Sequence, residues 1–218
     1  MLLTLTGSSC AGKSTLLRAL AGRLPGVALH DFDEIGVPAG PTSAWRQQAS
    51  EDWVRRALSC QRHGVDLLLA GQSPLGEVLA TPSAPELDGI AACLVDVADD
   101  ERRRRIALRG NESYSARHVE DLVSWGEWQR GHARDPRHRP EVLTARCWPA
   151  MAWHRWADWS AGDPRWHTDV LDTTGKPVAV SAAELVDWVE RRRAAYPQRA
   201  GGLSVRDGRL VQPDSQER

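Results

Sequence analysis

A loop motif near the N-terminus constrains the fold of this chain more than any other feature of its sequence. The segment Gly7–Ser14 reads GSSCAGKS and matches the pattern G-x-x-x-x-G-K-[ST] at every fixed position. The apolar run Leu2–Thr6 precedes it and predicts a buried strand, and a helical pattern over 14–24 follows it. A strand, a glycine-rich turn and a helix in this order predict an α/β fold.

The same motif predicts a site for phosphate groups. Backbone N–H groups of such a loop, together with those of the helix N-terminus, bind phosphate oxygens. We expect Lys13 to reach the β- and γ-phosphates of a nucleotide and Ser14 to offer its hydroxyl to Mg²⁺. Only two of the 28 basic residues are lysines, and one of them stands here. The residues expected to contact the nucleotide are Gly7, Ser8, Ser9, Cys10, Ala11, Gly12, Lys13, Ser14 and Thr15.

The rest of the chain alternates between short apolar runs and longer amphipathic segments. Further strands are predicted at 27–30, 65–70, 90–97 and 169–172. Further helices are predicted over 43–63, 99–109, 140–159 and 181–195. This alternation predicts a five-stranded parallel sheet with helices on both faces. We expect one domain over 1–196 and a tail over 197–218, with a small hairpin around the Asp207-Gly208 turn.

The composition limits which binding partners and which cellular compartment we expect for this protein. The 28 basic and 29 acidic residues give a net charge of −1, which argues against binding nucleic acid or an anionic membrane through overall charge. No apolar run approaches the roughly 20 residues that span a bilayer, and no signal-peptide pattern is visible. The four cysteines are widely spaced, which predicts reduced thiols. We therefore expect a cytoplasmic protein with no nucleic-acid or membrane partner, either a monomer or a homodimer.

The loop and the order of elements resemble the P-loop kinases of small molecules and nucleotides. Shikimate kinase, gluconate kinase, chloramphenicol phosphotransferase and the nucleoside monophosphate kinases share this order, and the resemblance covers roughly residues 1–195. It is specific only at the loop. The resemblance implies a site for ATP and Mg²⁺ and a mobile helical lid, which we place at 110–139, followed by a tryptophan-rich helical segment at 140–166.

A run of acids follows the second predicted strand. Because ligands bind at the carboxyl ends of strands in open α/β sheets, these acids should lie close to the loop. By resemblance to shikimate kinase-like enzymes, Asp31 would hold Mg²⁺ or its waters, and Asp33 would orient and deprotonate the acceptor. Glu34 is the substitute for either role. A different interpretation is that these acids only cap the following segment.

The third predicted strand ends without the acid that typical motor ATPases and helicases carry there. Gly71 and Gln72 follow this strand instead. Gly71 would allow close approach of a substrate and Gln72 could hydrogen-bond it, although loop capping is an equal alternative for Gln72. The departure fits small kinases that draw their magnesium acid from the second strand.

Arginines dominate the middle of the chain, with eleven arginines and six acids between residues 102 and 146. The four consecutive arginines from Arg102 would point in four directions on a helix, so most should be solvated or paired with acids. The resemblance implies that a lid arginine stacks on adenine or neutralises the transferred phosphoryl group, and the candidates are Arg109 and Arg117, then Arg130 and Arg134. It also implies that a loop with Gly175 and Pro177 wraps the adenine ring.

Tryptophan is unusually common. The chain has ten tryptophans against two tyrosines and one phenylalanine, and seven of the ten lie between Trp125 and Trp166. We expect these rings to fill a local helical core. The alternative is that some line a pocket for a flat or apolar ligand.

These features together favour an ATP-dependent kinase that phosphorylates a hydroxyl or a phosphate of a small molecule or nucleotide. One alternative is a kinase of nucleic-acid 5′ ends, which would use the basic 102–146 region for phosphate contacts. Another is a nucleotide-binding switch or resistance protein that does not transfer a phosphoryl group.

Overall fold

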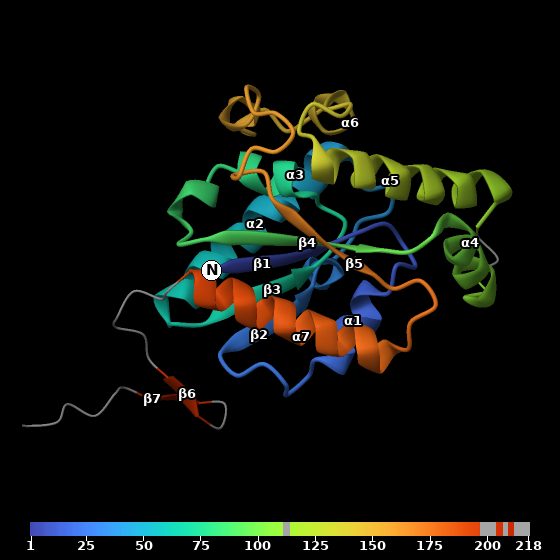
Figure 1. Ribbon diagram of the computed structural model, residues 1–218. Coiled ribbons are helices and arrows are strands. Elements are labelled where there is room, and N and C mark those ends of the chain that lie inside the picture. Colours follow the sequence, from blue (N-terminus) through green and yellow to red (C-terminus); the bar gives the residue numbers. More distant parts are fainter. Residues whose placement is uncertain (111–113, 197–203, 207–208, 212–218) are drawn as a thin grey trace, which may run out of the picture.

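The protein is built around one parallel sheet. The computed structural model describes residues 1–110, 114–196, 204–206 and 209–211. Five strands pair in the order β2-β3-β1-β4-β5, all parallel (Figure 1). They are β1 (Leu2–Thr6), β2 (Val27–Asp31), β3 (Asp66–Ala70), β4 (Ile90–Asp96) and β5 (Thr168–Asp172). This confirms the predicted five-stranded α/β fold and places β1, with the loop that follows it, in the centre of the sheet.

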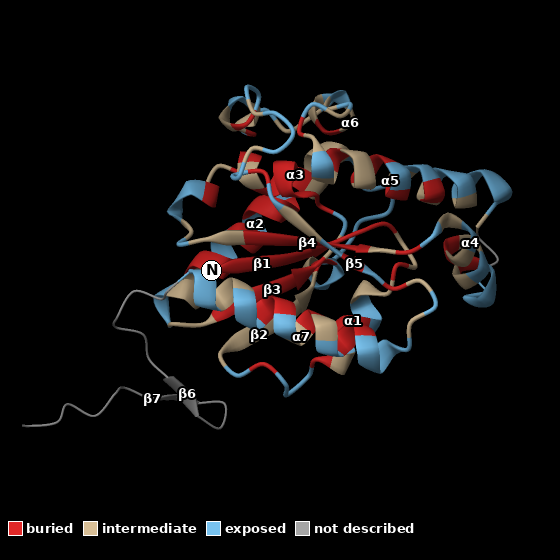
Figure 2. Ribbon diagram, viewed as in Figure 1, coloured by how far each residue is buried: buried red, intermediate tan, exposed pale blue. Residues whose placement is uncertain are grey.

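Helices cover both faces of the sheet, as predicted. Leu3 and Leu5 of β1 face one side, where they pack under α1 (Lys13–Ala19) and α7 (Val178–Ala195). Leu2 faces the other side, where α2 (Ser43–Arg62), α3 (Leu75–Ala80) and α5 (Ala116–Arg134) lie. The buried strands and the exposed outer surfaces of α5 and α7 are visible in Figure 2. Alternating side chains of one strand therefore supply two separate apolar cores.

The remaining elements are short, apart from α4 (Asp99–Leu108), which follows β4. They are α6 (Glu141–Thr144) and the 3₁₀ helices η1 (Phe32–Ile35), η2 (Ala84–Glu86) and η3 (Trp153–Arg155). In the tail, β6 (Ser204–Arg206) and β7 (Arg209–Val211) form an antiparallel pair where the hairpin was predicted. Its expected turn, Asp207-Gly208, lies outside the described residues.

Some predicted helices differ from the observed ones. The pattern over 14–24 ends as a helix at Ala19, and turns carry the chain to β2. The helix expected over 140–159 is wrong: only α6 and η3 are helical there. Pro149 lacks the N–H that a helix needs, and Arg146 adopts a left-handed backbone (φ 54°), so a continuous helix cannot form.

Three of the seven tryptophans between Trp125 and Trp166 lie in a buried core, as the first interpretation expected, and the other four are half-buried. Trp128 of α5 stacks on His132 with ring centroids 4.7 Å apart, and Trp156 and Trp166 contact the same imidazole edge-on. All three tryptophans are buried, and burial lowers the pKa of His132 to about 4, so that ring is neutral at physiological pH. The cluster joins segment 140–166 to α5 and to α3.

Two further observations concern partners and redox state. None of the described helices is long and apolar enough to cross a membrane. All four cysteines are free thiols, as predicted, and burial together with the nearby Asp169 carboxylate raises the pKa of Cys93 to about 12.

Candidate active site

The loop between β1 and α1 depends on its two fixed glycines. Gly7 has φ 148°, and a Cβ atom there would lie 2.4 Å from the carbonyl oxygen of Val95. Gly12 has φ 107°, a conformation that side chains with a Cβ rarely adopt. The loop can therefore approach β4 and turn into α1 only with glycine at these positions.

Lys13 turns back over the loop. Its Nζ atom donates to the carbonyl oxygens of Gly7 at 2.7 Å and Ser8 at 3.0 Å. Burial, assisted by the positive charge of Arg102, lowers the pKa of Lys13 to about 8. A negatively charged group bound in the loop would favour the protonated form of this amine.

The predicted magnesium residues meet in space. The Ser14 hydroxyl, in the first turn of α1, donates to Asp31 Oδ2 at 2.7 Å, at the carboxyl end of β2. Mg²⁺ prefers oxygen ligands and is commonly held by one or two side chains together with phosphates and waters. The described residues contain no cluster of three or more His, Cys, Asp or Glu side chains that could hold a metal. The Ser14 hydroxyl and the Asp31 carboxylate are oxygen donors of the kind that fits Mg²⁺ bound with a nucleotide.

The acids after β2 serve both as a cap and as a wall of the site. Asp31 Oδ1 accepts the Asp33 N–H at 3.2 Å, and Glu34 Oε1 accepts the Asp31 N–H at 2.8 Å. The other Glu34 oxygen lies 2.7 Å from His30 Nδ1, so Glu34 is committed to the cap. Asp33 is not, and partial burial followed by the negative charge of Asp31 raises its pKa. A carboxylate with a raised pKa suits a proton acceptor.

These groups surround one cavity of about 750 Å³ at the carboxyl edge of the sheet. The predicted site residues that line it are Ser9, Cys10, Ala11, Gly12, Lys13, Ser14, Thr15, Asp31, Asp33, Gly71, Gln72, Arg109, Gly175 and Pro177. The lining comes from five separate parts of the chain, which the fold brings together at the strand ends.

Six predicted residues lie outside that lining, and two of them are Arg130 and Arg134 of α5. Gly7 forms the turn, and the Ser8 hydroxyl donates to the Leu122 carbonyl of α5 at 2.6 Å. Glu34 belongs to the cap just described. Arg117 lies exposed in the first turn of α5. The structure thus separates Arg117 from Arg109, which stands at the end of α4 and lines the cavity.

A cavity arginine was missed by sequence reasoning. Arg105 of α4 donates to the hydroxyl of Thr173 at 3.0 Å and to its carbonyl oxygen at 2.8 Å. Arg105 and Arg109 are four residues apart, so both side chains lie on one face of α4 and both line the cavity. That spacing was the signal available in the sequence.

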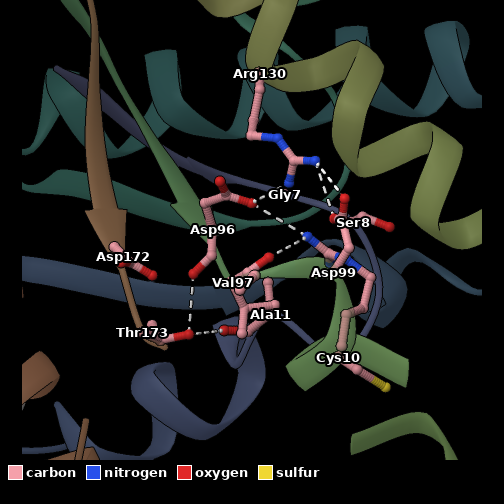
Figure 3. Close-up of polar contacts among 12 residues, drawn as sticks. Gly7, Ser8, Cys10, Ala11, Asp96, Val97, Asp99, Arg130, Asp172 and Thr173 are labelled. Carbon is pink, nitrogen blue, oxygen red and sulfur yellow. Dashed lines mark hydrogen bonds and ion pairs between the residues drawn. The ribbon is translucent and has the colours of Figure 1, made fainter. Parts of the chain in front are cut away.

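A buried arginine supports the loop from behind. Arg102 is completely buried and donates to the Ser9 carbonyl at 3.0 Å and to Asp96 Oδ1 at 3.2 Å. The same Asp96 oxygen accepts from Arg130 of α5 at 3.2 Å (Figure 3). This network joins the loop, β4, α4 and α5. Arg103 and Arg104 pair with acids, as expected for the consecutive arginines. Arg102 and Arg105 also pair with acids, and in addition they donate hydrogen bonds to backbone carbonyl oxygens of the loop.

Replacing Arg102 with methionine should destabilise the fold by about 3 kcal/mol, because it leaves buried polar groups without a partner. The free energy of unfolding in urea measures this. Arg104→Met is the matched control, since Arg104 is exposed and pairs with Glu101 on its own helix. Equal effects of the two substitutions would contradict the supporting role of Arg102.

Comparison with known protein structures identifies proteins with a similar fold. No family model matches the chain, and no curated protein matches its sequence. A sugar kinase from a Janibacter species superposes with a TM-score of 0.54 and 13% identity, covering 90% of this chain and 98% of that one. A candidate kinase from Chloroflexus aurantiacus gives a TM-score of 0.55 and 17% identity, covering 90% and 97%.

The chain has the fold of the P-loop kinases. At these identities the likeness concerns the fold, and the fold is the one that the loop and the element order predicted. The P-loop kinase fold accounts for the position of the cavity, because its loop follows the central strand and its other lining segments follow the neighbouring strands.

Proposed function

We propose that the protein is an ATP-dependent kinase that transfers the γ-phosphate to a hydroxyl or phosphate group of a small molecule. The observation that carries the proposal is the convergence of Lys13, the Ser14–Asp31 pair and Asp33 on one cavity. These are a cation for phosphate oxygens, oxygen ligands for Mg²⁺ and a carboxylate for the acceptor proton.

The nucleotide would bind with its phosphates in the loop. Backbone N–H groups of the loop and of α1 donate to the phosphates, and the Lys13 ammonium exchanges the Gly7 and Ser8 carbonyls for phosphate oxygens. Mg²⁺, held by Ser14 and Asp31, would offset the charge of the β- and γ-phosphates when bound. Gly175 and Pro177 would contact the adenine ring, and Arg109 would contact the ring or the transferred group.

Asp33 would act on the acceptor. The acceptor oxygen forms a bond to the γ-phosphorus, the bond to the bridging oxygen of ADP breaks, and ADP leaves. When the acceptor is a hydroxyl, its proton passes to a carboxylate oxygen of Asp33. The raised pKa of Asp33 brings its proton affinity closer to that needed at neutral pH.

Two other functions have less support. The α4 and α5 arginines that would contact a nucleic-acid backbone pair largely within the protein: Arg103 with Glu120, and Arg130 with Asp96 and Asp99. A nucleotide-binding protein without transfer would bind ATP and release no ADP. The test is therefore ATP binding measured by calorimetry, followed by ADP release with a panel of acceptors. ATP binding is expected, together with ADP release that depends on the acceptor. Absence of ADP release with every acceptor would contradict a kinase.

The free thiols suit the cytoplasmic location proposed from the sequence.

Nucleotide affinity should fall as the pH rises through about 8, the pKa of Lys13 in the empty loop. A bound phosphate raises the pKa of Lys13. Below pH 8 the amine is already protonated before the nucleotide binds, whereas above pH 8 nucleotide binding must be accompanied by uptake of a proton. The affinity for ADP should therefore drop up to tenfold per pH unit above this pKa. Calorimetry in buffers of different ionisation enthalpy measures the proton uptake. Lys176→Ala should keep this dependence, whereas a pH-independent affinity in the wild type would contradict it.

A further inference from the structure

Strand order divides the cavity into two halves. The loop after β1 lies at the centre. On one side are α4, which follows β4, and the 172–177 loop, which follows β5. On the other side lie Asp31 and Asp33, which follow β2, and Gly71 and Gln72, which follow β3. We refer to these as the β4/β5 half and the β2/β3 half.

Positive charge lies in the centre and in the β4/β5 half. Among the described residues that line the cavity, Lys13 and Arg18 belong to α1, and the other cations follow β4 or β5: Arg104, Arg105, Arg109 and Lys176. Glu101 also lines the β4/β5 half and pairs with Arg104 and Arg105, and Lys176 pairs with Glu184, so the net positive charge there comes from the two arginines that share one acid and from Arg109. The described lining of the β2/β3 half consists of two aspartates, a glycine and a glutamine. Since the nucleotide would occupy the loop and the cationic half, the acceptor would meet the acidic half, beside Asp33.

An arginine does stand behind the β2/β3 half, but its charge is already matched. Arg46, in the first turn of α2, donates through Nε at 3.0 Å and through Nη2 at 2.7 Å to Glu77 Oε2. The Glu77 side chain is completely buried, and the Ser50 hydroxyl donates to its other oxygen at 3.2 Å. A buried carboxylate held this way needs its cationic partner, so withdrawing Arg46 to bind an acceptor anion would leave Glu77 uncompensated.

We propose that the acceptor is a hydroxyl compound without a negative charge, such as a polyol, a sugar or an amino alcohol. Asp31 would be matched by Mg²⁺, but a phosphate acceptor would still bring about two negative charges next to Asp33, with no unpaired cation in the described lining of that half to offset them. A neutral hydroxyl can donate to Asp33 and accept from Gln72, and a cationic group would be attracted to the same acids. This inference rests on the proposed kinase function and narrows it to hydroxyl acceptors.

The test uses the full chain with Mg²⁺ and compares two ligands by calorimetry. ATP reports the nucleotide half alone. Diadenosine pentaphosphate adds phosphates that would extend into the β2/β3 half, so it should bind no more tightly than ATP. In the Asp33→Asn variant the pentaphosphate should gain affinity relative to ATP, because a repelling charge is removed. A pentaphosphate that gains no affinity relative to ATP in the Asp33→Asn variant would contradict repulsion by Asp33.

ADP release completes the test, with glucose-derived probes that differ in charge and with one nucleotide probe. Glucose and glucosamine provide the uncharged and cationic arms, gluconate and glucose phosphate provide the anionic arm, and a nucleoside monophosphate provides a phosphate acceptor. Tenfold tighter binding of the pentaphosphate than of ATP, or phosphorylation of any anionic probe, would overturn the assigned acceptor class alone. Absence of ATP binding would overturn the proposed function, and this inference with it.

Discussion

Lys13→Ala should abolish phosphoryl transfer and leave the fold intact. Lys13 lies inside the loop, 2.7 Å from the Gly7 carbonyl oxygen, where its ammonium would meet the transferred phosphate. Removing a positioned charge of this kind lowers turnover by about 10²–10³-fold or more. ADP release at saturating ATP measures the loss, and the urea midpoint shows that the protein is folded. Full ADP production by the variant would contradict the assignment of the nucleotide site.

Lys13→Arg should fail as well. The planar guanidinium is wider than an ammonium and cannot act as a point charge between the two loop carbonyls. Lys176→Arg is the matched control, because Lys176 also lines the cavity but pairs with Glu184 at 2.8 Å outside the loop. Arginine can replace lysine in that pair, so Lys176→Arg should retain most of the turnover.

Asp33→Asn should lower turnover by roughly 10²–10⁴-fold, the usual effect of removing a positioned general base. ATP affinity should change little, because Asp33 lies in the half of the cavity where we propose that the acceptor binds. Asp31→Asn should instead raise the Mg²⁺ requirement, since Asp31 accepts from Ser14 at the predicted metal position. Titrations in acceptor and in Mg²⁺ separate the two effects.

Glu34→Gln serves as the comparison for both variants. A glutamine oxygen can still accept the Asp31 N–H, so the cap should persist and turnover should fall far less than in Asp33→Asn. Normal turnover of Asp33→Asn together with an inactive Glu34→Gln would mean that Glu34 is the base. Full activity of all three variants would reduce the acidic run to a cap.

The fold could be predicted because its signals are local. The loop motif fixes a strand, a turn and a helix in sequence, and short apolar runs mark the other strands. The helix α3 escaped prediction because it is buried on nearly every side and therefore shows no amphipathic pattern. A helix was also expected over 140–159, yet Trp156 in this segment packs by contacts with Gly76 of α3 and His132 of α5.

The site was predictable to the extent that its residues follow strands. Asp31, Asp33, Gly71 and Gln72 come after β2 and β3, and the shared edge of the sheet brings them to the loop. The roles of residues whose orientation depends on the rotation of a helix were harder to predict from the sequence. Four consecutive arginines in α4 look alike in sequence, and only the packing of α4 turns Arg102 to the back of the loop, as its hydrogen bond to the Ser9 carbonyl shows.

The central claim is that this cavity transfers the γ-phosphate of ATP to an organic acceptor. The most direct measurement uses ATP labelled in its γ-phosphate, with Mg²⁺ and the uncharged hydroxyl acceptors, and follows where the label goes. The account predicts label in a phosphorylated organic product for the wild type and none for Lys13→Ala. Label recovered only as inorganic phosphate, or retained in ATP with every acceptor, would contradict it.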